Sequence, residues 1–84
     1  MTSIAFTDNL SEVLNFNGFV KFKVEGMVQG QEVVLYEENI AANNFDRIEE
    51  DWAVIKVNKS TTHYLIGNYK IRRTSANISV GYAT

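Results

Sequence analysis

Hydrophobic and polar residues alternate along much of this chain, with the period of two that is typical of half-buried strands. The clearest example is the segment 19–25, in which apolar side chains fall on one face and charged side chains on the other: Val20, Phe22 and Val24 against Lys21, Lys23 and Glu25. The pattern predicts a strand with one face in a hydrophobic core.

Turn residues separate this segment from further predicted strands. Gly26 and Gly30 bracket a short connection to residues 31–38, and we expect the two flanking strands to pair as a hairpin. Residues 39–44 have loop chemistry, and the spacing of Phe45 and Ile48 fits either one helical turn or a short irregular strand. Three more strands are expected at 52–57, at 63–72 with an interruption at Gly67–Asn68, and at 78–82.

The first seventeen residues allow two interpretations. Ile4 and Phe6 fit the start of a strand, and residues 12–16 fit another. A short helix is the competing interpretation, because Leu10, Val13 and Leu14 have helical spacing behind Asp8. We favour the strand, so residues 1–17 are expected to form an N-terminal arm or an edge strand.

The composition agrees with an all-β fold. Nine Val and seven Ile outnumber four Leu and six Ala, and proline, which would remove donors from a ladder, is absent. With 84 residues, the chain suffices for one domain, residues 1–84. We therefore predict a small antiparallel β-sandwich or small barrel of six to eight short strands, jelly-roll-like or immunoglobulin-like, with room for one short helical turn.

Charge and special residues exclude several functional classes. Eight Lys and Arg against ten Asp and Glu give a net charge of −2, which argues against binding to nucleic acid or to anionic lipid. Without cysteine, the chain has no disulfide and no thiolate nucleophile. The N-terminus has neither a basic region nor a long apolar run, so we expect neither a signal peptide nor a membrane span.

Candidate catalytic groups have simpler explanations. His63 follows Ser60, Thr61 and Thr62, but a Ser–His pair needs an orienting group and an oxyanion hole, which the sequence does not indicate. Acidic residues flank the loop at 39–44, yet neighbouring residues of a strand point to opposite faces, which favours a solvated rim over a metal or acid–base site. We expect no catalytic residue, no metal and no cofactor.

The order of charges along the chain is more informative. Residues 32–51 hold seven acids and one Arg, and residues 52–84 hold five bases and no acid. Two interpretations stay open: separate patches that steer docking onto another protein, or adjacent strands that pair their charges across the sheet. The candidate interface residues are Trp52, Tyr64, Lys70, Arg72, Arg73, Glu37, Glu38, Glu49 and Glu50.

Aromatic residues make up 12% of the chain, which is enough for a ligand platform if they gather on one face. The candidates for a sugar-binding or base-stacking platform are Trp52, Tyr64, Tyr69, Tyr82 and Phe19. The alternative, which we favour, is that such residues fill the core and interfaces of so small a domain.

Four segments resemble small bacteriophage virion proteins of the β-sandwich type: FVKFKVEG at 19–26, GQEVVLY at 30–36, YKIRRTS at 69–75 and ISVGYA at 78–83. The likeness lies in strand-and-turn patterns over roughly residues 11–83. The chain departs from it at residues 37–45, where those proteins usually carry a Ser/Asp/Gly turn followed by Trp.

The resemblance implies a non-enzymatic structural protein located in the virion after assembly in the host cytoplasm. A head decoration (cement) protein that stabilises the shell is the first expectation, and a neck or tail component is the second. The implied partners are capsid or other virion proteins and further copies of the chain, as a homo-oligomer with a trimer favoured. The alternative function is a carbohydrate- or receptor-binding module of a tail fibre.

Overall fold

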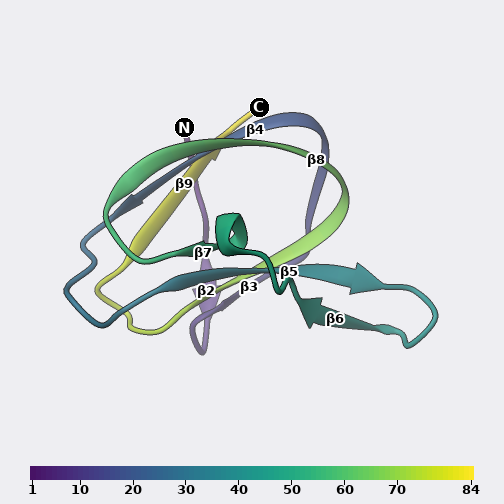
Figure 1. Ribbon diagram of the computed structural model, residues 1–84, viewed down its shortest axis with the longest axis horizontal. Coiled ribbons are helices and arrows are strands. Elements are labelled where there is room, and N and C mark those ends of the chain that lie inside the picture. The colour runs from purple at the N-terminus through teal and green to yellow at the C-terminus, as the bar shows by residue number, and fades with distance from the viewer.

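Antiparallel strands form nearly the whole molecule in the computed structural model, which describes residues 1–84 (Figure 1). The elements are β1 (Thr2–Ser3), β2 (Phe6–Thr7), β3 (Leu10–Ser11), β4 (Leu14–Glu25), β5 (Val33–Asn39), β6 (Asn44–Arg47), the 3-10 helix η1 (Asp51–Ala53), β7 (Val54–Ile55), β8 (Lys59–Arg73) and β9 (Ser79–Ala83). The predicted all-β antiparallel class is confirmed. Nine strands replace the expected six to eight, because the N-terminal residues supply three short ones.

The strands hydrogen-bond into one sheet with β8 at its centre. One edge of β8 pairs with β4 along 59–69, and the other edge pairs with β5 along 69–73. Beyond β4 lie β9 and then β1, and beyond β5 lie β6 and β7. Figure 1 shows β4 and β8 curving together, so that the two facing layers of this small fold come from one curled sheet.

Two glycines lie where the long strands must bend. Gly18 in β4 and Gly67 in β8 both have positive φ, +135° and +120°, which side chains other than glycine rarely adopt. Glycine inside a strand typically marks such a bend. The interruption predicted at Gly67–Asn68 is therefore wrong, since β8 continues through it for 15 residues.

The predicted hairpin between residues 19–25 and 31–38 is also wrong. β4 pairs with β8 and β9, and β5 pairs with β6, β7 and β8, so β4 and β5 lie on opposite edges of β8. The connection between them is a crossover fixed by a distant turn: Asn77 Nδ2 donates to the carbonyl oxygen of Gly26 (2.6 Å) and to Gln31 Oε1 (2.8 Å). Sequence proximity and the two bracketing glycines favour a hairpin, but neither feature specifies the partner of a strand.

The core lies inside the curl. Alternate residues of β4 are buried as predicted, and Phe22 and Val20 are 0% exposed. The other large, fully buried side chains come from β4, β5, β7, β8 and the residue before β9: Val24, Val33, Leu35, Ile55, Ile71 and Ile78. The one buried polar residue is Ser11, whose Oγ accepts a 2.8 Å hydrogen bond from the backbone N–H of Ile71.

Short elements settle the local alternatives. The N-terminal segment is extended rather than helical, with β2 and β3 joined by a tight turn in which Asp8 and Asn9 both have positive φ. Phe45 lies in a strand, β6. The expected strand at 52–57 is limited to Val54–Ile55, because Trp52 belongs to the 3-10 turn before it.

Candidate interaction surfaces

An exposed apolar patch lies on the outer face of the β4–β8 ribbon. Phe19 pairs across the ladder with Tyr64, and their rings meet edge to face with centroids 5.0 Å apart. Ile66 is diagonal to Phe19 on the same face, and the three side chains are 70%, 61% and 60% exposed. We call Phe19, Tyr64 and Ile66 the aromatic patch. Contiguous apolar surface of this kind is typical of contact sites with other molecules.

Trp52 extends this aromatic region around the edge of β8. Its ring packs on His63 with centroids 4.9 Å apart, its Nε1 donates to Glu50 Oε2 (2.7 Å), and it is 37% exposed. A shallow recess lies between Trp52, His63 and Tyr64. Of the predicted platform residues, Tyr69 and Tyr82 instead pack against Phe16 of the core. The platform is therefore smaller than the sequence allowed.

His63 lies on the core-facing side of β8 and is half-buried at the rim. Its Nε2 is 2.9 Å from Thr61 Oγ1. Ser60 projects from the opposite face of the strand, because adjacent residues alternate. Burial, and to a smaller degree the charge of Lys59, lowers the pKa of His63 from its ordinary value of 6.5.

The lowered pKa makes stability depend on pH in a defined window. At high pH, His63 is neutral in both states; as the pH falls through 6.5, the unfolded chain binds a proton before the folded one does, so stability declines until the folded pKa is passed. We expect the urea midpoint of the wild type to fall between about pH 7.5 and about pH 5.5 by more than that of His63→Gln. Parallel profiles for the two proteins would contradict this assignment.

Cations of the basic stretch lie over aromatic rings. Lys70 Nζ is 4.9 Å from the ring centroid of Phe45, and the Arg72 guanidinium is 5.8 Å from that of Tyr36. Both pairs lie on the outer face formed by β5, β6 and β8. These contacts leave the cations at the surface and hold their side chains in place.

Arg73 connects parts of the fold. Its guanidinium is 4.2 Å from the Phe6 ring, while its Nε donates to Asn9 Oδ1 (3.0 Å) and its Nη1 donates to the carbonyl oxygen of Ile78 (2.8 Å). This side chain ties the β2–β3 turn to the segment before β9. These contacts within the chain give Arg73 a structural role that requires no external partner.

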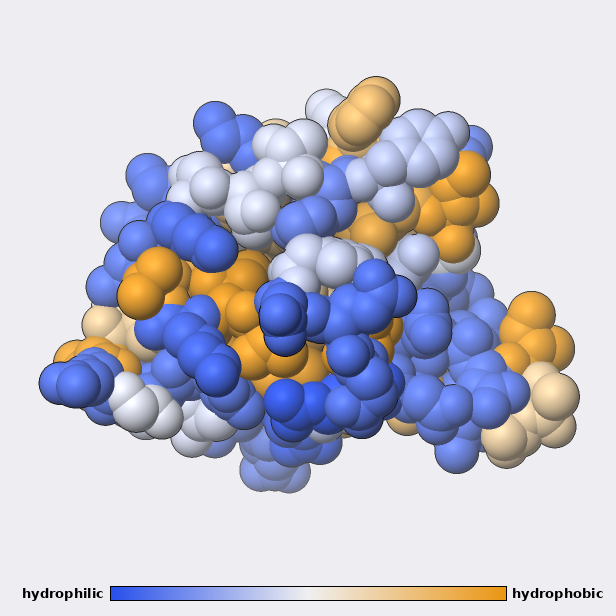
Figure 2. Space-filling model, viewed as in Figure 1, coloured by the Kyte–Doolittle hydropathy of each residue, from blue (hydrophilic) through white to orange (hydrophobic).

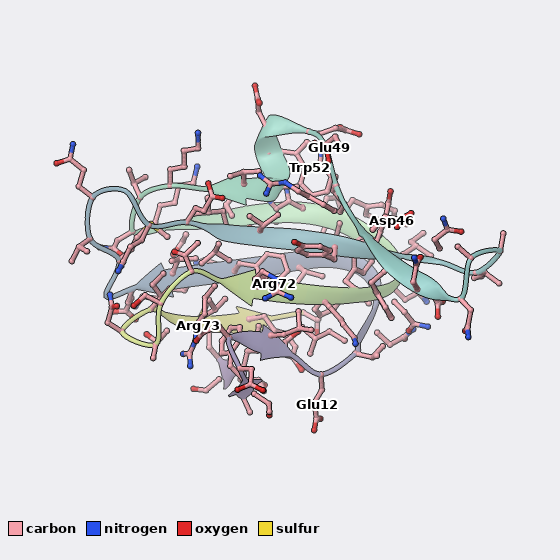
Figure 3. All side chains as sticks on the ribbon, turned by 90° about the horizontal axis from the view of Figure 1, so that it is seen from below. Glu12, Asp46, Glu49, Trp52, Arg72 and Arg73 are labelled. Carbon is pink, nitrogen blue, oxygen red and sulfur yellow. The ribbon has the colours of Figure 1, made fainter.

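The acidic candidates lie in two places. Glu37 and Glu38 are exposed on the outer half of β5, and Glu49 and Glu50 are exposed just before η1. Figure 3 shows Glu49 and Trp52 at one side of the molecule and Arg72 and Arg73 farther across it. The nine candidate residues therefore do not converge on a single site.

The acidic and basic stretches of the chain are adjacent in the sheet but form no ion pair with each other. The acidic strand β5 and the basic end of β8 are neighbours. Two ion pairs are present, Lys23–Glu25 at 3.6 Å and Arg47–Glu32 at 3.9 Å, and neither joins the acidic stretch to the basic one. The acidic and basic strands are therefore neighbours without pairing their charges. The side chains of both stretches stay available to solvent or to a partner.

The largest recess, about 520 Å³, opens beside η1. Its apolar lining is Ile48, Val54 and Val57, and charged residues of both signs complete it. No group of three or more His, Asp or Glu side chains is placed to hold a metal ion. The only helical segment, three residues long, is too short to cross a membrane.

The chain matches no protein-family model, and neither the curated proteins nor the solved structures contain a significant match.

Sequence reasoning missed several exposed aliphatic residues. Ile40 is 83% exposed, and Val28 and Val57 are each 59% exposed. The sequence pattern places these residues in loops or strands and does not mark them as contact residues. For Ile40 a signal existed: it is a large apolar side chain within a run of turn residues, where no core can cover it.

Proposed function

We propose that this protein is a non-enzymatic structural subunit of a bacteriophage particle, acting as a capsid decoration protein that binds across capsid subunits. The virion setting comes from the four segments that resemble small phage proteins. The observation that carries the docking role is the aromatic patch, because three large apolar side chains, each at least 60% exposed, are adjacent on one face.

The patch is preorganised for binding. It lies on a continuous ladder in which eleven residues of β4 pair with β8, so little conformational entropy is lost on docking. Lys21 and Lys23 project from the same face of β4, and Lys23 is 3.6 Å from Glu25 there, which leaves Lys21 as the unpaired cation. The surface therefore suits an apolar site with an acidic border, in which burial of the rings gives affinity and Lys21 steers the approach.

Repetition explains how a small contact can stabilise a shell. A standard interface buries about 1,600 Å² in total, and each copy that bridges two capsid subunits adds its binding free energy to that joint. Many copies on one shell then slow its opening, even where each single contact is modest.

Binding to shells that lack decoration tests the proposal. The wild type is expected to co-sediment with such shells, and Tyr64→Ser is expected to bind about 30-fold more weakly, which corresponds to about 2 kcal/mol for a central aromatic residue. Asn17→Ser is the matched control, because Asn17 is exposed on the same face of β4 and pairs with Ile66. A wild type that stays in the supernatant would end the proposal.

A second candidate, a carbohydrate-binding module, is favoured by one observation. Trp52, Tyr64 and Phe19 all carry exposed rings, and sugar rings stack on such faces. Specific binding to a glycan array, together with no binding to shells, would favour this candidate over the decoration role.

A further inference from the structure

The β5–β6 hairpin forms an arm at one end of the molecule (Figure 1). Its turn is closed by hydrogen bonds: the N–H of Asn43 donates to the carbonyl oxygen of Ile40 (3.2 Å), and the N–H of Ala42 donates to Asn39 Oδ1 (3.1 Å). Ile40 at the tip is 83% exposed, the highest value among the large apolar residues. The arm therefore presents an aliphatic side chain to its surroundings.

The sides of the arm are acidic. Residues 37–46 contain Glu37, Glu38 and Asp46 and no base. Glu37 lies directly opposite Asp46 in the ladder, an arrangement in which like charges destabilise a strand pair. Basic groups from another molecule would relieve this repulsion.

The end of the molecule opposite the arm carries an apolar recess with a lysine at its border (Figure 1). It is formed by residues 27–30 and 56–58, has a volume of about 430 Å³, and includes Val28 and Val57, each 59% exposed. The two segments are joined by Asn58, whose Oδ1 accepts from the N–H of Met27 (2.8 Å) and whose Nδ2 donates to the Met27 carbonyl oxygen (3.0 Å). Lys56 lines the recess, and exposed Lys59 follows Asn58 in sequence; both lysines also line the larger recess beside η1, which carries acids as well. We call this recess the socket.

The two ends are complementary to each other. Figure 2 shows apolar atoms at both ends of the molecule, which is 36 Å long. The arm combines an apolar tip with three acids, and the socket combines an apolar floor with Lys56 and Lys59. Contact between two arms would bring six acids together, so attraction exists only between unlike ends.

We propose that copies of this chain join head to tail, with the arm of one copy in the socket of the next. Ile40 packs between Val28 and Val57, and the acids of the arm face Lys56 and Lys59. Such a heterologous contact closes into a ring when the rotation between copies allows it, and a ring of three matches the expected trimer. The inference rests on the proposed function for its setting and deepens it by naming the surfaces through which copies join.

Charge reversal provides the test, with the assembly mass measured by sedimentation at micromolar to millimolar protein. The wild type is expected to assemble, and to dissociate as salt is raised. The arm variant Glu37→Lys/Glu38→Lys and the socket variant Lys56→Glu/Lys59→Glu are each expected to associate at least about tenfold more weakly. Mixing the two variants is expected to restore association between unlike variants, in pairs and alternating chains rather than in a closed ring of three, because only there does each arm meet a socket of opposite charge.

Two single substitutions separate this contact from others. Ile40→Asp is expected to give a monomer, whereas Ile66→Asp, at an exposed position of the aromatic patch, leaves the assembly mass unchanged. A wild type that stays monomeric at millimolar concentration overturns the inference, as does a mixture that fails to associate while both variants remain folded by circular dichroism. An assembly broken by Ile66→Asp and not by Ile40→Asp also overturns it.

The shell-binding assay, run on the same samples, keeps this inference distinct from the proposed function. A monomer that binds shells refutes the arm-and-socket contact and leaves the decoration role standing. An assembly that does not bind shells supports the arm-and-socket contact and refutes the decoration role.

Discussion

Phe22→Ala is expected to lower the free energy of unfolding by about 3–5 kcal/mol, the range for truncating a large buried aromatic residue. Phe22 is 0% exposed, is the largest fully buried side chain, and packs edge to face against Phe16 with centroids 5.8 Å apart. An 84-residue domain has a total stability of roughly 4–13 kcal/mol. The substitution therefore removes a large share of it, which urea unfolding followed by Trp52 fluorescence will measure.

Phe19→Ala is the control for this prediction. Phe19 lies three residues earlier in the same strand but is 70% exposed, so its loss should change stability by less than about 1 kcal/mol. Equal effects of the two substitutions would contradict the orientation of β4.

Gly26→Ala is expected to destabilise the fold by about 3 kcal/mol, for two separable reasons. Gly26 has φ +79°, a conformation that a non-glycine residue adopts at a cost of about 1–2 kcal/mol. In addition, a Cβ at this position would overlap the carbonyl oxygen of Asn77, a backbone atom that cannot move without shifting the turn. The same urea titration measures the sum of both effects.

Gly30→Ala isolates the first effect. Gly30 has φ +89°, yet nothing lies within 4 Å of the position of its Cβ, so only the conformational cost of about 1–2 kcal/mol applies. If Gly26→Ala proves no more harmful than Gly30→Ala, the close packing of the crossover against Asn77 is refuted.

The alternation of apolar and polar residues predicts which face of a strand is buried. It does not predict which distant strand is its partner. The phase of Val20, Phe22 and Val24 identifies the core face of β4, because that information lies within the strand itself. The partner of β4 begins only at Lys59, and no property of residues 19–38 distinguishes that distant strand from the adjacent one. Glycine is ambiguous for a similar reason, since it permits a bend as readily as a break.

The interface candidates show the same division. The exposure of Tyr64 follows from its alternation with buried Leu65. The roles of Arg72 and Arg73 do not follow from their identical chemistry: adjacent positions place one over Tyr36 at the surface and the other against Phe6 and Asn9. The sequence does not predict the arm, because residues 39–44 have the composition of an ordinary loop. The acids on the two sides of the arm become neighbours only when β5 and β6 pair.

The central position of β8 in the sheet affects how the chain can fold during synthesis on the ribosome. The two main neighbours of β8, β4 and β5, are synthesised before it. Each of them makes its longest strand pairing with β8. A nascent chain with only its first 58 residues exposed thus has apolar faces and no strand to close them. We therefore expect the sheet to be completed only after β8 and then β9 have left the ribosome, and chaperones that shield extended apolar segments can act on the chain until then.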